Sequence, residues 1–190
     1  MTAKENVAFP PSGSNEMVQL WKRENSGRYW NAATEFVTAT APGLASGGIL
    51  ADDMGLGKTL QIISLILTGG PGTTLIVAPV SVMSNWEQQM KRHVLPEHVP
   101  NILMYHSGYT ADSKRVTATD LMKYDVVITS YGKLARELDG DDKVLTDAAA
   151  KWRRVVLDEG HNIRNAKTKI ARAACEVNAK SRWVLSGTPM

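Results

Sequence analysis

Residues 47–61 have the sequence GGILADDMGLGKTLQ, and this stretch decides the fold. Its first part, Gly48-Ile49-Leu50-Ala51, is short and apolar, as expected of a strand buried in a sheet. A loop with two glycines follows, and residues 60–67 are mostly apolar, which favours a helix. A strand that leads through a glycine loop into a helix is the repeating unit of α/β proteins with a parallel sheet.

The same alternation continues to the end of the sequence. Further strands are expected at 75–78, 101–105, 126–129, 154–157 and 183–185, and helices at 81–94, 111–123, 132–138 and 166–177. The strands are rich in Val, Ile and Leu, which is typical of a parallel sheet covered by helices on both faces. We therefore predict an α/β domain over residues 46–190. The preceding extension, residues 1–45, is expected to be weakly structured or helical, with a short helix around Met17 to Glu24.

The composition excludes several classes of protein. The 190 residues are 43% hydrophobic and 22% charged, which is ordinary for a globular domain and excludes bulk disorder. The formal net charge of +3 is too small to prove a polyanionic partner. The single cysteine, Cys175, excludes an internal disulfide and a cysteine-cluster metal site, so we expect no zinc and a reducing compartment. Its neighbours Ala174 and Val177 predict that Cys175 is a small buried core residue.

We expect neither a membrane segment nor a signal peptide. Residues 59–86 carry no charge, but Gly69-Gly70-Pro71-Gly72 divides them into two apolar pieces. Neither piece reaches the ~20 residues that a membrane-spanning helix needs. The start of the chain, Met1 to Pro11, has no long apolar run.

The loop GLGKT, residues 55–59, has the chemistry of a phosphate-binding loop. Its glycines allow successive backbone N–H groups to point at phosphate oxygens, and the following helix adds the positive end of its dipole. Lys58 is expected to reach the β- and γ-phosphates, and the Thr59 hydroxyl to bind Mg²⁺. The full P-loop pattern begins with a glycine where this chain has Asp52, so an ordinary glycine turn is the alternative. The residues expected to bind the nucleotide are Asp53, Met54, Gly55, Leu56, Gly57, Lys58 and Thr59.

A second motif, VVLDE at residues 155–159, has two acidic residues at the end of an apolar stretch that is expected to be a strand. Asp158 is expected to hold Mg²⁺ through its waters, and Glu159 to orient and deprotonate the attacking water. We therefore expect Lys58, Asp158 and Glu159 to carry the catalysis. Two alternatives remain, a solvated acidic turn and a metal site formed by His161 with the two acids. One histidine and two adjacent acids offer poor ligand geometry for zinc.

Taken in order, these motifs resemble those of the Swi/Snf-type DNA-translocating ATPases. Residues 47–61 resemble motif I of that family, in which Asp52 is normal, and DEGH at 158–161 resembles motif II. The stretches 75–86, 125–131 and 185–189 are similar to motifs Ia, Ib and III. Gly160, together with residues 161–165 and 22–31, is similar to the helicase-like transcription factor group, whose members act on double-stranded DNA in repair and chromatin work.

The resemblance implies a fold, ligands and partners. The fold is a RecA-like P-loop ATPase lobe, the cofactors are ATP and Mg²⁺, the partner is double-stranded DNA or chromatin, and the location is the nucleus. A second RecA-like lobe, which supplies an arginine to the γ-phosphate, is needed for turnover. The residues implied to couple the state of the nucleotide to movement of the two lobes are His161, Ser186 and Thr188. The implied DNA contacts are Ser81, Asn85, Thr129, Ser130 and Lys133, with a helix cap at Ser81 and sheet packing at Thr129 as the alternatives.

Two departures from the family pattern affect what we expect of this chain. The family has an adenine-reading glutamine upstream of motif I, whereas Gln19, the only glutamine in that part, is not expected to be in register. The chain also stops at Met190, just after motif III, so we expect the lobe alone to bind Mg-ATP weakly and to hydrolyse it slowly. The alternatives are a non-catalytic module that binds a nucleotide or a partner, and a truncated gene product.

Overall fold

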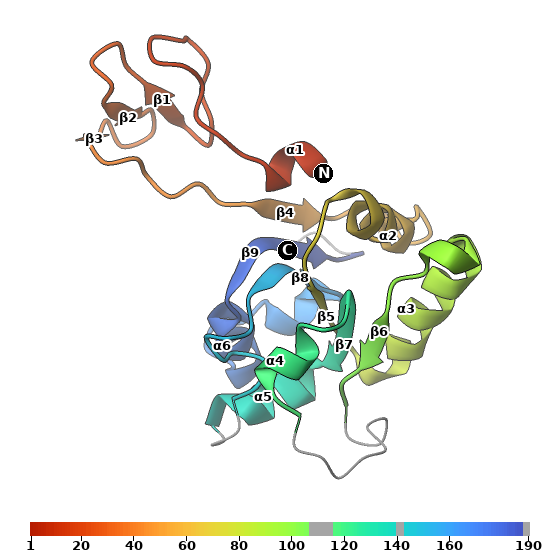
Figure 1. The fold of residues 1–190 in the computed structure, drawn as a ribbon. Helices are drawn as coiled ribbons and strands as arrows, with labels where there is room; N and C mark the ends of the chain where they lie inside the picture. The colour runs from red at the N-terminus through yellow and green to blue at the C-terminus, as the bar shows by residue number, and fades with distance from the viewer. Residues whose placement is uncertain (107–115, 140–142, 188–190) are drawn as a thin grey trace. The chain divides into compact units, whose positions relative to one another are not determined.

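The computed structural model describes residues 1–106, 116–139 and 143–187 (Figure 1). The chain forms two compact units, Met1–Gly47 and Gly48–Met190, and each is described by itself.

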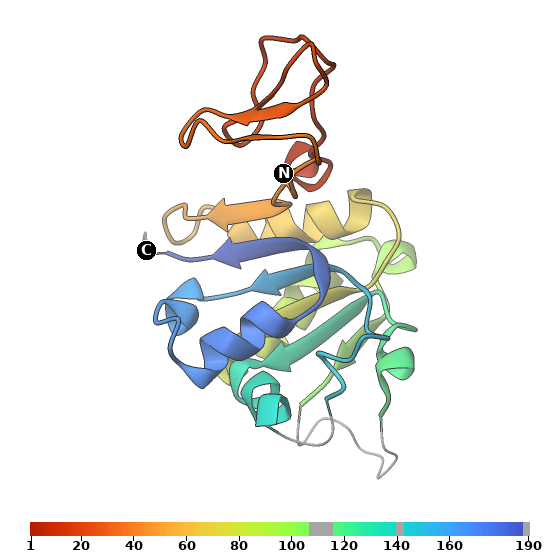
Figure 2. The same cartoon turned by 90° about the vertical axis from the view of Figure 1, so that its left-hand side faces the viewer.

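The larger unit is built on a six-stranded sheet with the strand order β4-β9-β8-β5-β7-β6. The strands from β9 to β6 pair in parallel, and the arrows of β4 and β9 also point the same way (Figure 2). The predicted α/β fold with a parallel sheet is therefore confirmed. The strands are β4 (Gly47–Leu50), β5 (Thr74–Ala78), β6 (Ile102–Met104), β7 (Val126–Ser130), β8 (Trp152–Leu157) and β9 (Ala179–Leu185).

Helices cover both faces of this sheet. α2 and α3 pack together on one face, and α5 and α6 pack together on the other (Figure 1, Figure 2). Because both faces are covered, every residue of β5 and of β7 is buried, which explains their runs of branched aliphatic side chains. The helices are α2 (Lys58–Thr68), α3 (Val80–His93), α4 (Ala118–Leu121), α5 (Tyr131–Asp139) and α6 (Lys169–Glu176), with 3₁₀ turns at Pro96–His98 and Gly160–Ile163.

The register of the strands brings the loops with polar residues to one edge of the sheet. Val77 of β5 lies opposite both Leu157 of β8 and Thr129 of β7. Leu157 in turn lies opposite Val184 of β9. The segments that follow these strands therefore emerge side by side at the carboxyl edge, where parallel α/β sheets bind their ligands.

Several element boundaries differ from those expected. α3 begins at Val80 after Pro79 and has no side-chain cap, so the predicted cap by Ser81 is wrong. α6 begins at Lys169 rather than 166, because the Thr168 side chain accepts a hydrogen bond from the Ala171 amide at 3.2 Å and caps the helix there. β9 begins at Ala179 rather than 183. Of the helix expected over 111–123, residues 111–115 lie outside the described residues.

The smaller unit contains a short helix, α1 (Thr2–Glu5), and a three-stranded antiparallel sheet. Its strands are β1 (Trp21–Arg23), β2 (Tyr29–Asn31) and β3 (Val37–Thr38). The helix expected around Met17 to Glu24 is wrong. Gln19 and Leu20 adopt left-handed backbone angles, with φ of 49° and 67°, and this reverses the chain before β1 pairs with β2.

The expectation that Cys175 is buried is also wrong. Its neighbours Ala173, Ala174 and Val177 pack into the core, whereas the Cys175 thiol is exposed. Core packing needs only one face of α6, and Cys175 lies on the other. In the part of the chain that the structure describes, no helix is long and apolar enough to cross a membrane.

The Thr168 cap can be tested by removing its hydroxyl. We expect Thr168→Ala to lower the free energy of unfolding of the larger unit by about 1 kcal/mol, because the first turn of α6 loses a partner for an amide. Thr168→Ser keeps the hydroxyl and is the control. Urea unfolding followed by circular dichroism measures both variants, and an unchanged free energy in Thr168→Ala would contradict the assignment.

Candidate functional site

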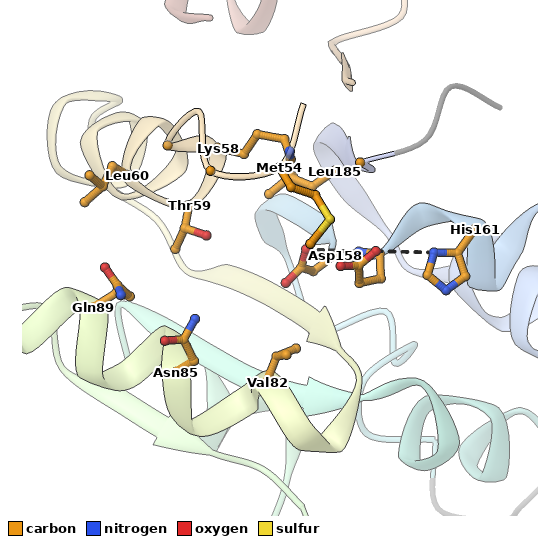
Figure 3. A pocket seen from close by; sticks show the side chains of 14 residues that line it. Met54, Lys58, Thr59, Leu60, Val82, Asn85, Gln89, Asp158, His161 and Leu185 are labelled. Carbon is orange, nitrogen blue, oxygen red and sulfur yellow. Dashed lines mark hydrogen bonds and ion pairs between the residues drawn. The ribbon is translucent and has the colours of Figure 1, made fainter. Parts of the chain in front are cut away.

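A pocket of about 600 Å³ opens at the carboxyl edge of the sheet (Figure 3). Its walls come from the loop between β4 and α2, from the first turn of α2, from α3, from the segment that follows β8, and from the end of β9 with the residues after it. This volume lies within the roughly 300–1,000 Å³ of small-molecule sites. The lining residues are Met54, Gly55, Gly57, Lys58, Thr59, Leu60, Val82, Asn85, Gln89, Asp158, Glu159, His161, Leu185 and Gly187.

The glycine loop has the backbone that a phosphate cradle needs. Gly55 and Gly57 have φ of +84° and +78°, a conformation that glycine adopts without strain. No atom of another segment lies within 4 Å of where a Cβ would stand at either position, so there is open space beside the loop at both glycines. Gly57 is the N-cap of α2, whose first amides therefore have no partner from within the helix. Such an amide-rich helix start attracts anions.

Lys58 folds back onto this loop. Its Nζ donates hydrogen bonds to the carbonyl oxygens of Asp52, at 2.6 Å, and of Asp53, at 2.9 Å. Thr59 follows on α2 and lines the pocket (Figure 3). Asp53 and Leu56, which were also expected to contact a nucleotide, are not among the lining residues.

Asp158 is held from three directions. Its Oδ2 accepts a hydrogen bond from the indole N–H of Trp86 at 2.8 Å, and its Oδ1 accepts one from the amide of Glu159 at 2.9 Å. The Tyr131 hydroxyl donates to its backbone carbonyl at 2.7 Å. Burial raises the pKa of the Asp158 carboxyl, and the hydrogen bond from Trp86 opposes this rise. Burial also raises the pKa of Tyr131, as do the charges of Asp158 and Glu159, so the hydroxyl stays a donor.

Glu159 has a strained backbone. Its φ of 53° and ψ of 61° place it in the left-handed region, which is uncommon for a residue with a side chain. Its Oε2 lies 3.3 Å from Nδ1 of His161, and both residues line the pocket. Backbone strain of this kind occurs at functional sites, where it aims a side chain.

α3 forms the wall of the pocket opposite the glycine loop. Asn85, expected to contact DNA, lies in this wall, and its side chain points across the pocket toward Thr59 (Figure 3). Val82 and Gln89, which no sequence motif indicated, line the pocket beside Asn85. Their spacing of three and four residues from Asn85 on an expected helix was the signal that could have found them.

The remaining residues with a predicted DNA contact differ in exposure. Ser81 is exposed at the start of α3. Thr129 is fully buried, and its hydroxyl donates to the carbonyl of Tyr105 at 2.8 Å. Ser130 is also buried, and its Oγ accepts from the Lys133 amide at 3.1 Å, as a helix cap does. In this structure Thr129 and Ser130 therefore serve sheet packing and the start of α5.

Lys133 pairs with a carboxylate of its own helix and also contacts Tyr105. Its Nζ lies 3.2 Å from Oε1 of Glu137 and 4.7 Å from the centre of the Tyr105 ring. Glu137 is buried, and its other contacts are the Tyr105 hydroxyl and the Leu145 amide. Lys133 thus neutralises a buried carboxylate in this structure.

The three predicted coupling residues are placed differently. His161 is mostly exposed at the pocket, whereas Ser186 is buried and its amide donates to the carbonyl of Leu50 at 3.1 Å. Thr188 lies outside the described residues. Among the residues that the structure describes, no group of three or more His, Cys, Asp or Glu side chains is placed to hold a metal ion.

Gln19, the one upstream glutamine, is occupied within the smaller unit. Its Nε2 donates to the carbonyl of Ala45 at 2.6 Å, and its Oε1 accepts from the amide of Ala45 at 2.8 Å. The amide nitrogen and the amide oxygen of the Gln19 side chain are thus both hydrogen-bonded to the backbone of the smaller unit.

Comparisons with known proteins agree on one family. A family model described as the SNF2-related domain matches residues 14–190. Over 76% of its length the chain is 40% identical to an uncharacterized ATP-dependent helicase of Schizosaccharomyces pombe, of which it spans 16%. Over 84% of its length it is 34% identical to the DNA repair protein RAD5B of Arabidopsis thaliana, of which it spans 15%.

A solved structure gives the same result. The SWI2/SNF2 ATPase core of Sulfolobus solfataricus in complex with double-stranded DNA is similar, with a TM-score of 0.58 and 33% identity. The similarity covers 75% of this chain and 27% of that one. The chain therefore corresponds to a minor part of the longer proteins that it matches.

The strain at Glu159 can be measured. Glu159→Gly removes the side chain and relieves the left-handed backbone, whereas Glu159→Gln removes the charge and keeps the strain. We expect Glu159→Gly to be the more stable of the two by about 1 kcal/mol in urea unfolding. Equal stability of the two variants would show that the backbone at Glu159 is not strained.

Proposed function

Because this chain belongs to the SNF2-related family, we propose that it is the ATP-binding lobe of a DNA-dependent ATPase of the Swi/Snf type. The resemblance inferred from the sequence motifs is confirmed by the family model and the relatives. The proposed setting is translocation on double-stranded DNA in repair or chromatin remodelling, in the nucleus.

The observation that carries this proposal is the convergence of two motifs on one pocket. The glycine loop with Lys58 and the acid pair Asp158-Glu159 lie far apart in the sequence, yet they line the same cavity. The open space around Gly55 and Gly57 fits a phosphate chain, and the start of α2 favours its negative charge. The residues present therefore fit ATP.

Different residues of the pocket are proposed to bind different parts of Mg-ATP. Lys58 exchanges its loop carbonyls for the β- and γ-phosphate oxygens. The hydroxyl of Thr59 and the carboxylate of Asp158 are oxygen ligands of the kind that Mg²⁺ prefers, directly or through water. When bound, Mg²⁺ neutralises negative charge on the phosphates during phosphoryl transfer.

Glu159 is the proposed general base. Its carboxylate orients the attacking water and accepts a proton from it. The left-handed backbone aims this side chain into the pocket, and His161 at 3.3 Å steadies it. His161, Ser186 and Thr188 remain the proposed residues that couple the nucleotide to movement of the lobes.

Turnover is proposed to require a second RecA-like lobe. In phosphoryl transfer, an arginine that meets the γ-phosphate contributes about 10³–10⁵ in rate. The chain spans 16% of one relative and 15% of another, and the second lobe is proposed to lie in the rest of such a protein. This chain alone is therefore expected to bind Mg-ATP weakly and to hydrolyse it slowly.

The phosphate assignment is tested by Lys58→Ala. We expect this variant to bind a fluorescent ATP analogue about tenfold or more weakly, because a charged hydrogen-bond donor to the phosphates is lost. Fluorescence anisotropy in the presence of Mg²⁺ measures the affinity. Lys91→Ala is the matched control, since it removes an exposed lysine of α3 that pairs with Glu87 and is not among the residues that line the pocket. Equal affinities of wild type and Lys58→Ala would overturn the proposal.

Double-stranded DNA is the proposed partner at the carboxyl edge. The similar ATPase core of Sulfolobus solfataricus was solved in complex with double-stranded DNA. Ser81 is exposed at the start of α3, where a hydroxyl can donate to a phosphate. Contacts of this kind position a protein on DNA without reading its sequence.

A DNA contact at Ser81 is tested by titrating a labelled duplex. We expect weak binding that falls steeply between low and physiological salt, because phosphate contacts release counterions. Ser81→Ala should weaken it several-fold, whereas Thr129→Val should not, since the Thr129 hydroxyl is buried against the Tyr105 carbonyl. Binding that is indifferent to salt would count against phosphate recognition.

A further inference from the structure

Trp86 places its one polar atom on the proposed metal ligand. The residue lies on α3, and only 1% of it is exposed. Its indole N–H donates to Oδ2 of Asp158 at 2.8 Å, across 72 residues of sequence. A buried indole N–H needs an acceptor, and here that acceptor is a carboxylate at the pocket.

This hydrogen bond fixes the orientation of the carboxylate. Oδ1 of Asp158 accepts from the Glu159 amide, while Oδ2 accepts from Trp86, so the two oxygens cannot exchange places without breaking both bonds. Each carboxylate oxygen has about two acceptor positions. One position on each oxygen is therefore left for a metal ion or its water. Tyr131 holds the backbone of the same residue through its carbonyl.

Trp152 shows the difference between this contact and ordinary packing of an indole. It is equally buried, with 2% exposed, but its N–H donates to the backbone carbonyl of Leu145 at 2.9 Å. That bond satisfies the indole and orients no side chain of the pocket. The bond from Trp86 is made to the ionisable carboxyl group of Asp158. It stabilises the charged form of that group and so partly offsets the effect of burial on its pKa.

We propose that Trp86 is a positioning residue whose indole N–H holds the Asp158 carboxylate in the orientation that binds Mg²⁺. The inference rests on the proposed function, because it takes Asp158 as a ligand of Mg²⁺ or of its waters. Hydrogen bonds to a metal ligand of this kind raise metal affinity by about 10–100-fold. Trp86 comes from α3, so this helix contributes to the proposed metal binding through the orientation of Asp158.

The test is the Mg²⁺ dependence of nucleotide binding in Trp86→Phe. We measure the anisotropy of a fluorescent, non-hydrolysable ATP analogue on the 190-residue chain while Mg²⁺ is titrated. Phenylalanine keeps an aromatic ring in the core and removes the N–H. We expect the Mg²⁺ concentration for half-maximal binding to rise about tenfold or more, with little change of affinity in EDTA. Mn²⁺ in place of Mg²⁺ should show the same displacement.

Trp152→Phe is the matched control, because it removes a buried indole donor away from the pocket. If its Mg²⁺ curve moves as far as that of Trp86→Phe, the effect is one of packing and the proposal fails. If Trp86→Phe keeps the wild-type curve while Lys58→Ala loses binding, Trp86 has no positioning role but the nucleotide site stands. If the wild type shows no Mg²⁺-dependent binding, both proposals fall.

A second measurement decides the case in which Trp86→Phe does not fold. The chain has five tryptophans, so ¹⁵N-indole labelling gives one N–H resonance for each. We expect Asp158→Asn to shift the resonance of Trp86, because the charge of its acceptor is lost, and Mg²⁺ with nucleotide to shift the same resonance in the wild type. If no indole resonance moves in either experiment, Trp86 does not act on Asp158.

Discussion

Val77 of β5 and Leu157 of β8 lie opposite each other in a parallel register, and the amide of Asp158 donates to the carbonyl of Val77 at 2.9 Å. This pairing determines where both strands end relative to each other. β5 leads through Pro79 into α3, and β8 leads into the acid pair, so a helix and two carboxylates start next to each other. A slip of one residue would turn Asp158 to the other face of the sheet and dismantle the pocket.

Much of this arrangement could be predicted because its signals are local. The glycine loop, Lys58 and the acids after β8 each belong to a short stretch whose chemistry is visible in the sequence. The two runs of aliphatic residues in β5 and β7 reflect burial on both faces, which is what a parallel sheet requires. The structure brings Lys58, Thr59, Asp158 and Glu159 to one cavity, while their chemical roles stay predictions.

The rest depends on contacts between distant parts of the chain, which local patterns do not reveal. Trp86 looks like a core residue in the sequence, and only the register of the sheet shows that its N–H meets Asp158. Cys175 sits among apolar neighbours, yet the outward face of α6 exposes it. Residues 17–24 have the composition of a helix, but the left-handed turn at Gln19 and Leu20 and the pairing of β1 with β2 override it.

The contact between Lys58 and the carbonyls of Asp52 and Asp53 also bears on how a ligand leaves. An ammonium group that loses its anion in a partly dry pocket is poorly solvated, and this opposes departure. In this structure two carbonyl oxygens of the same loop accept hydrogen bonds from the Lys58 ammonium group, so loss of the proposed phosphate ligand leaves that group with two partners. The carbonyl oxygens of Asp52 and Asp53 thus compete with a phosphate for the Lys58 ammonium group, which lowers the affinity of the proposed nucleotide site for its product.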